Sequence, residues 1–86
     1  MNRGVPNESV VRIVGDDLGL TRGEVQIMSR EDVGPLASLL SIPDSVEEVL
    51  VQFEVDRQGN DAVLVGGRGP GGGEWTIYYD TATIGL

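Results

Sequence analysis

Three features of this chain could take part in chemistry: pairs of adjacent carboxylates, a glycine-rich loop and scattered hydroxyl side chains. The carboxylate pairs are Asp16-Asp17, Glu31-Asp32 and Glu47-Glu48. Adjacent residues of a strand point to opposite faces, so nearness in sequence does not make such a pair the two cooperating carboxylates of a hydrolase. The hydroxyl groups have no base to activate them, because the chain contains no histidine. We therefore expect that the protein is not an enzyme.

The sequence pattern also predicts no metal or cofactor site. The chain lacks cysteine and histidine, which are the usual ligands of zinc. Asp56, Asn60 and Asp61 do not have the spacing of a calcium-binding loop, and ordinary turn formation explains them better.

The loop from Gly66 to Gly73 invites comparison with phosphate-binding loops. It carries Arg68 where such a loop needs a lysine followed by Ser or Thr, and it leads into a strand instead of a helix. We therefore expect no bound nucleotide. The loop is either a mobile hairpin connection or a segment that becomes ordered, with Arg68 at its tip, when a partner binds.

The elements that must position these residues are centred on Val46 to Asp80, a stretch that predicts a three-stranded antiparallel meander. A three-residue loop, Gln58-Gly59-Asn60, would join the first two strands. This loop pairs Arg57 with Asp61, Val55 with Val63 and Phe53 with Val65. The spacing of Val46, Val49, Leu50 and Phe53 also fits a helix, but the four valines between Val46 and Val55 favour a strand.

The third strand of the meander shows a clear alternation of side chains. A period of two places Trp75, Ile77 and Tyr79 on the buried face and Thr76, Tyr78 and Asp80 on the outward face. After it, Thr81 to Leu86 forms either a fourth strand or an apolar tail that docks on a partner.

Before the meander, we expect a flexible lead at residues 1–8 and a single domain over residues 9–86. Ser9 to Val14 and Glu24 to Ser29 predict two strands that form a hairpin with a long loop. Pro35 at a first helical position predicts a helix from Pro35 to Ile42, which Pro43 ends. The predicted fold is a small α+β domain: an N-terminal hairpin, one short helix and a C-terminal three- to four-stranded meander, which could close partly into a barrel.

Charge limits the partners that this protein can have. Fourteen acidic residues against six arginines give a net charge of −8, which disfavours direct binding to nucleic acid or to an anionic membrane. No run approaches the ~18 apolar residues of a membrane span, and the N-terminus lacks the pattern of a secretory signal. We expect a soluble, cytoplasmic protein. Arginine without lysine suits a high-GC genome, and the acidic balance suits a high-salt cytoplasm equally well.

An acidic row on the first strand of the meander is the most suggestive feature. Glu48, Gln52, Glu54 and Asp56 point outward, with Leu50 interrupting them. Alternate residues of a strand lie about 6.6 Å apart, close to the spacing of phosphates along a nucleic-acid strand. The row could therefore mimic nucleic acid in the groove of a nuclease or another nucleic-acid-binding protein. The alternative is the solvated face of a half-buried strand.

A glycine loop that enters an aromatic strand, after a short helix and a valine-rich strand, resembles some small bacterial immunity proteins that neutralise toxins. The size and charge resemble those of small phage-encoded inhibitors. Both resemblances imply a protein that binds and blocks another protein, although no exact motif assigns a family. The function hypothesis is an acidic, non-enzymatic inhibitor or antidote that occupies a basic protein surface through Glu48, Glu54, Asp56, Arg68 and Tyr78. The alternative is an assembly subunit that forms homo-oligomers through its C-terminal strand.

Overall fold

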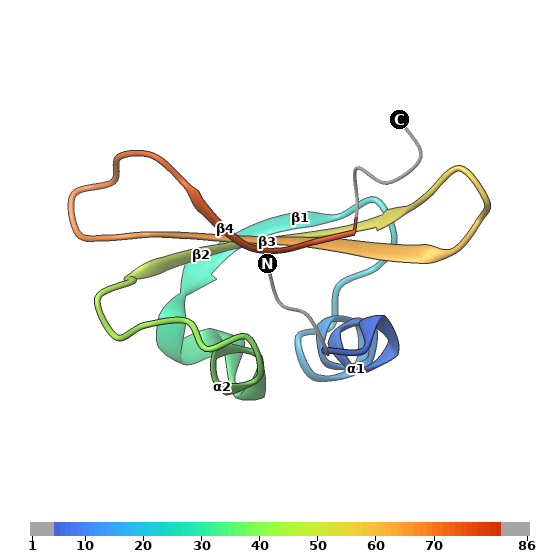
Figure 1. The fold of residues 1–86 in the computed structure, drawn as a ribbon, viewed down its shortest axis with the longest axis horizontal. Coiled ribbons are helices and arrows are strands. Elements are labelled where there is room, and N and C mark those ends of the chain that lie inside the picture. Colours follow the sequence, from blue (N-terminus) through green and yellow to red (C-terminus); the bar gives the residue numbers. More distant parts are fainter. Residues whose placement is uncertain (1–4, 82–86) are drawn as a thin grey trace.

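Figure 1 shows the computed structural model, which describes residues 5–81 as a four-stranded antiparallel sheet with helices on one side. The strands are β1 (Val25–Ser29), β2 (Glu48–Val55), β3 (Asp61–Arg68) and β4 (Thr76–Asp80), and they lie side by side in this order. The predicted α+β class and the C-terminal meander are confirmed, although the sheet is open and does not close into a barrel. Within residues 5–81, every helix is too short or too polar to span a membrane.

Helical segments cover the lower face of the sheet in Figure 1. They are α1 (Asn7–Arg12), its π-helical continuation η1 (Ile13–Asp17), the 3-10 turn η2 (Arg30–Val33) and α2 (Pro35–Leu39). The core lies between these segments and the sheet, and its fully buried side chains include Val10, Val14, Val33, Leu36, Val49, Val51, Val63 and Val65. The upper face of the sheet carries no helix.

The predicted strand from Ser9 to Val14 is wrong, because the chain is helical from Asn7 to Asp17. Val10 and Val14 are four residues apart, so a helix places both on one face, and both are fully buried. Burial of this stripe outweighs the preference of β-branched residues for strands. The predicted N-terminal hairpin therefore does not form, and β1 pairs with β2 instead. Asn7 and Glu8, which were expected in the flexible lead, belong to α1.

The helix that begins at Pro35 is confirmed, but it ends at Leu39 and not at Ile42. Ser41 adopts the left-handed region with φ 54°. The Ser41 amide donates to the Ser38 carbonyl, and the Ile42 amide donates to the Ala37 carbonyl at 2.9 Å. These two bonds form a Schellman motif, so a left-handed residue ends the helix two positions before Pro43.

The hairpin between β2 and β3 has a register different from the predicted one. Val55 pairs with Asp61 and Phe53 pairs with Val63, so the connecting loop spans residues 56–60. The Asp56 carboxylate explains the longer loop, because it accepts hydrogen bonds from the amides of Gln58 and Asn60, each at 2.9 Å. The shift is an even number of residues, so each side chain keeps its predicted face.

A β-bulge in the β3–β4 pair corrects the predicted faces of the third strand. Val65 pairs with Tyr79, whereas the adjacent Gly66 pairs with Ile77, so Tyr78 is the extra residue. Tyr79 is buried in the core and Tyr78 packs against it from the same side. The side chain of Ile77 is instead 46% exposed on the upper face.

Gly66 and Gly67 belong to β3 and not to the glycine-rich loop. A Cβ at Gly67 would lie 2.9 Å from both Tyr78 Cε2 and Val46 Cγ1 on the helix-covered side. The absence of a side chain at Gly67 therefore lets Tyr78 and Val46 close over the end of the sheet. Of the predicted fourth strand or tail, Thr81 to Leu86, residues 82–86 lie outside the described residues.

We expect Gly67→Ala to lower the free energy of unfolding by about 1–3 kcal/mol, because the added methyl group overpacks this contact. Gly66→Ala is a matched control in the same strand, since its Cβ would meet no atom closer than 3.5 Å. That variant should change stability by less than about 1 kcal/mol. Urea denaturation of both variants measures the difference, and equal destabilisation would contradict the packing described here.

Candidate functional site

The upper face of the sheet, which we call the open face, is an uncovered surface with an apolar centre. Ile27, Leu50, Gly66 and Ile77 stand in register across the four strands and form one row. Val25 and Leu64 lie on the same face in the next row. The side chains of Ile27 and Val25 are 53% and 50% exposed, and no described element covers this row (Figure 1). An apolar row left open in this way is a feature of interaction surfaces.

Charged groups border this apolar row along one side. Glu48 and Arg68 face each other across β2 and β3, and Arg68 Nε donates to Glu48 Oε1 at 2.6 Å. The Arg68 guanidinium also stacks on Trp75, 4.2 Å from the ring centroid. Arg68 therefore ends a strand and is held on the open face, whereas the sequence predicted it at the tip of a loop. Trp75, which was predicted to be buried, is half-buried beneath this arginine.

The carboxylates of the predicted acidic row divide between two places. Glu54 lies on the open face, where it accepts a hydrogen bond from Gln52 Nε2 at 2.8 Å. Asp56 lies beyond the end of β2 and is used in the hairpin turn. Of the five predicted partner-binding residues, Glu48, Glu54 and Arg68 thus share one face, while Asp56 closes a turn and Tyr78 packs on the helix-covered side.

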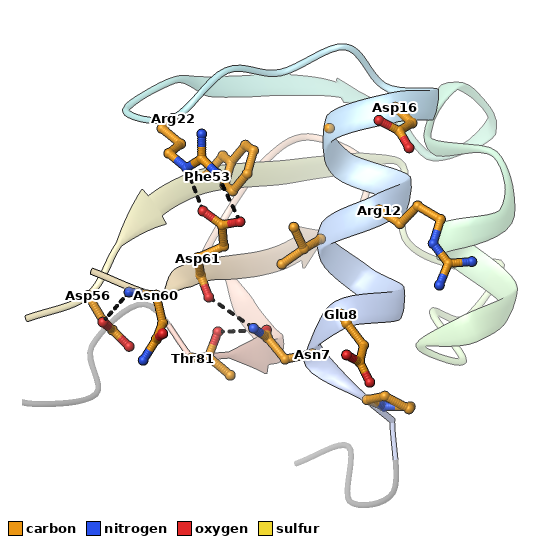
Figure 2. Close-up of a pocket in the computed structure, with 13 residues that line it drawn as sticks. Asn7, Glu8, Arg12, Asp16, Arg22, Phe53, Asp56, Asn60, Asp61 and Thr81 are labelled. Carbon is orange, nitrogen blue, oxygen red and sulfur yellow. Dashed lines mark hydrogen bonds and ion pairs between the residues drawn. The ribbon is translucent and has the colours of Figure 1, made fainter. Parts of the chain in front are cut away.

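A groove with a volume of ≈ 930 Å³ lies between α1 and the end of the β2–β3 hairpin. Figure 2 shows Arg22, Phe53 and Asp61 on the strand side of this groove and Glu8 and Arg12 on the helix. Its lining is mixed in charge. The groove therefore presents both acidic and basic side chains to a ligand.

Asn7 joins the two sides of this groove. Its Nδ2 donates to the Asp61 carbonyl at 2.9 Å, and its Oδ1 accepts from Thr81 Oγ1 at 3.1 Å (Figure 2). The same Oδ1 accepts from the Tyr79 hydroxyl at 2.8 Å. A single side chain at the start of α1 therefore fixes the helix to β3 and to the residues at the end of β4. This role could not be predicted from the sequence, because Asn7 and Tyr79 are far apart in the chain and nothing local marks the pair.

Two of the charged groups along the groove, Arg22 and Asp61, are paired with each other. Arg22 forms a two-point contact with Asp61, with Nε to Oδ1 at 2.5 Å and Nη2 to Oδ2 at 3.1 Å, and it also lies over Phe53. The hydrogen bond and the charge of Asp61 raise the pKa of Arg22. Glu24, nearby in sequence, accepts hydrogen bonds from the Thr21 amide and from Gln26, and these bonds lower its pKa.

Within residues 5–81, no three acidic side chains are placed to hold a metal ion. In the same range, every buried side-chain nitrogen or oxygen has a hydrogen-bond partner. The open face consequently stands out as the candidate site, because its exposed groups serve no purpose in the packing of the core. No protein-family model, curated protein or solved structure matches this chain, so the candidate site stands on its geometry alone.

We expect Asn7→Ala to lower the free energy of unfolding by about 1–3 kcal/mol, because it leaves the buried Tyr79 hydroxyl without an acceptor. Tyr79→Phe removes the hydroxyl itself and should cost about 0.5–1.5 kcal/mol. The double variant should lose less than the sum of the two single losses. Chemical denaturation of all four proteins completes the cycle, and strict additivity would show that the contact contributes nothing.

Stability should also fall at alkaline pH because of Tyr79. Burial raises the pKa of Tyr79, although a hydrogen bond with Thr81 partly opposes this effect. The folded state therefore favours the neutral phenol. Its contribution is fully present below the unfolded pKa of about 10 and is lost as the pH rises through the folded value. Denaturation midpoints measured across this range should fall less steeply for Tyr79→Phe than for the parent, and parallel curves would contradict the assignment.

Proposed function

We propose that this protein is a non-enzymatic binding protein whose open face occupies a basic surface of another protein, as an inhibitor or antidote does. The observation that carries the proposal is the uncovered row of Ile27, Leu50 and Ile77, in which Ile27 and Ile77 are exposed and Leu50 is half-buried. Glu48 borders this row, and Glu54 lies further along β2 on the same face. Protein interfaces commonly combine an apolar centre with a polar rim. The open face has this composition.

The net charge of −8 supports a basic partner. Opposite charges on two proteins accelerate their encounter, and salt weakens this effect because exposed charges are screened over about 8 Å at physiological ionic strength. The apolar row would then contribute to slow dissociation, since its burial releases water from apolar surface. Charge and apolar area thus have separate roles in the proposed complex.

The open face favours a protein surface with an apolar centre as its target over a groove that only recognises phosphates. Glu48 is already paired with Arg68, and Asp56 is used in a turn, so the regular row of charges is interrupted. Leu50 and Ile77 have no counterpart in a phosphate backbone. A nucleic-acid-binding protein or nuclease remains a suitable partner where its basic site is bordered by apolar side chains.

The proposal is tested by capturing the partner from the native host on the immobilised parent protein and then measuring its binding to three variants. Glu54→Lys reverses a charge on the open face, whereas Glu31→Lys makes the same change on η2, beneath the sheet. Glu54→Lys should slow association by roughly tenfold or more at low salt, and Glu31→Lys should have a much smaller effect. Ile77→Ser should mainly accelerate dissociation.

Each variant must first be shown to have the melting temperature of the parent within a few degrees. A captured partner that binds Glu54→Lys and Ile77→Ser as well as it binds the parent would overturn the proposal. A larger effect of Glu31→Lys would move the site to the helix-covered side.

A further inference from the structure

The edge of the sheet formed by β1 is unprotected. Val25–Ser29 contains no charged residue and no proline, its pairing with β2 is regular, and no described strand lies beyond it. Proteins usually guard such an edge with charges, proline or a bulge, because it can accept another strand. The opposite edge is guarded in this manner, since β4 carries a bulge and Asp80.

The hydrogen bonds between β1 and β2 show which backbone groups face the free edge. The Arg30 amide donates to the Glu47 carbonyl at 3.1 Å, and the Phe53 amide donates to the Glu24 carbonyl at 2.9 Å. Alternate residues of an antiparallel pair bond to the neighbouring strand. Even-numbered residues of β1 therefore bond to β2, and the amides and carbonyls of Val25, Ile27 and Ser29 point outward.

We propose that a second copy of this chain pairs its β1 with this edge, antiparallel and about a twofold axis at Ile27. This register places Ile27 opposite Ile27 of the second copy and Val25 opposite Ser29 of the second copy. Each outward residue then donates one hydrogen bond and accepts another, so the whole edge is satisfied. The result is one continuous sheet across two copies.

The position of the axis follows from the structure. An axis at Gln26 or Met28 would require backbone groups that are already bonded to β2. An axis at Ser29 would set the strand against η2, which begins at Arg30. Ile27 is the central residue of β1 and belongs to the outward set, so it satisfies both conditions.

Side chains along this register are also compatible. The residues that flank β1 come together as Glu24 opposite Arg30 of the second copy, which are of opposite sign. The half-exposed side chains of Val25 and Ile27 would be partly buried near the axis. A basic peptide would find no carboxylate within Val25–Ser29, so the strand complements itself better than it complements such a peptide.

Self-association and binding of a basic partner should respond to salt in opposite directions. Each copy carries a net charge of −8, so two copies repel one another, and salt screens this repulsion. The dimer should therefore strengthen as ionic strength rises, whereas the complex with a basic partner should weaken. The dimer uses the outward backbone groups of β1 and the proposed complex uses side chains of the open face, so each proposal can fail without the other even though Val25 and Ile27 lie in both surfaces.

Ser29→Pro is the most specific test. The backbone of Ser29 has φ −71° and ψ 156°, which proline adopts without strain, and its side chain makes no capping bond. Proline removes only the outward amide, so the monomer should keep its melting temperature. Ser29→Ala is the matched control, because it removes the hydroxyl and keeps the amide.

Sedimentation equilibrium over a range of concentrations should show that the parent and Ser29→Ala dimerise with the same Kd. The Kd of Ser29→Pro should be at least roughly tenfold higher, because each dimer loses two symmetry-related hydrogen bonds. A parent that is monomeric at millimolar concentration in high salt would overturn the proposal. So would a folded Ser29→Pro protein that dimerises as tightly as the parent.

Amide exchange in the parent gives a second readout that does not depend on any variant. Protection of Val25, Ile27 and Ser29 should rise with protein concentration, while protection of Gln26 and Met28 should not change. Concentration-dependent protection along β4 in place of β1 would assign the interface to the other edge and contradict the proposal.

Discussion

Burial of a single face of the sheet is the constraint on which the rest of this structure depends. α1 and α2 are short, and Val10 of α1 and Leu36 of α2 are fully buried in the core between the helical segments and the lower face of the sheet. Short helices of this kind are stable only when they pack on something else. The helices therefore depend on the sheet for their stability, and their packing gives the sheet one buried face and one open face.

The bulge at Tyr78 assigns the aromatic residues to these two sides. It directs Tyr79 into the core, where the hydroxyl reaches Asn7 of α1, and it leaves Ile77 on the open face. Trp75 then stacks with Arg68, which is itself paired with Glu48. The extra residue in β4 therefore has two effects. It allows Tyr79 to contact Asn7 of α1, and it places Ile77 on the surface that we propose for binding.

Local pattern predicted much of this fold, and it failed where long-range contacts decided the outcome. Alternation in β2 correctly placed Glu48, Gln52 and Glu54 on one face, and the fixed φ of proline correctly placed the start of α2 at Pro35. The same reasoning assigned Ser9 to Val14 to a strand, because β-branched residues favour strands and only burial against β3 makes this segment helical. The bulge could not be inferred from a period of two, since an unbroken alternation gives no sign of the residue at which it breaks.

The candidate site was predictable in part for the same reason. Glu48 and Glu54 follow from the alternation of a strand, and Arg68 was singled out, although as the tip of a loop. The apolar row needed the registers of all four strands, which bring Ile27, Leu50 and Ile77 together from distant parts of the sequence. Asp56 and Tyr78 were chosen from local sequence, and a turn and a bulge moved them away from this face.

The most direct test of the central claim, that the open face is the binding surface, is carboxyl footprinting of the captured complex. Carbodiimide labelling followed by mass spectrometry compares each carboxylate in the free and the bound protein. Glu54 on the open face should be protected in the complex, while Glu31 on η2 should be labelled equally in both states. Protection of Glu31 with unchanged labelling of Glu54 would contradict this claim and would place the partner on the helix-covered side.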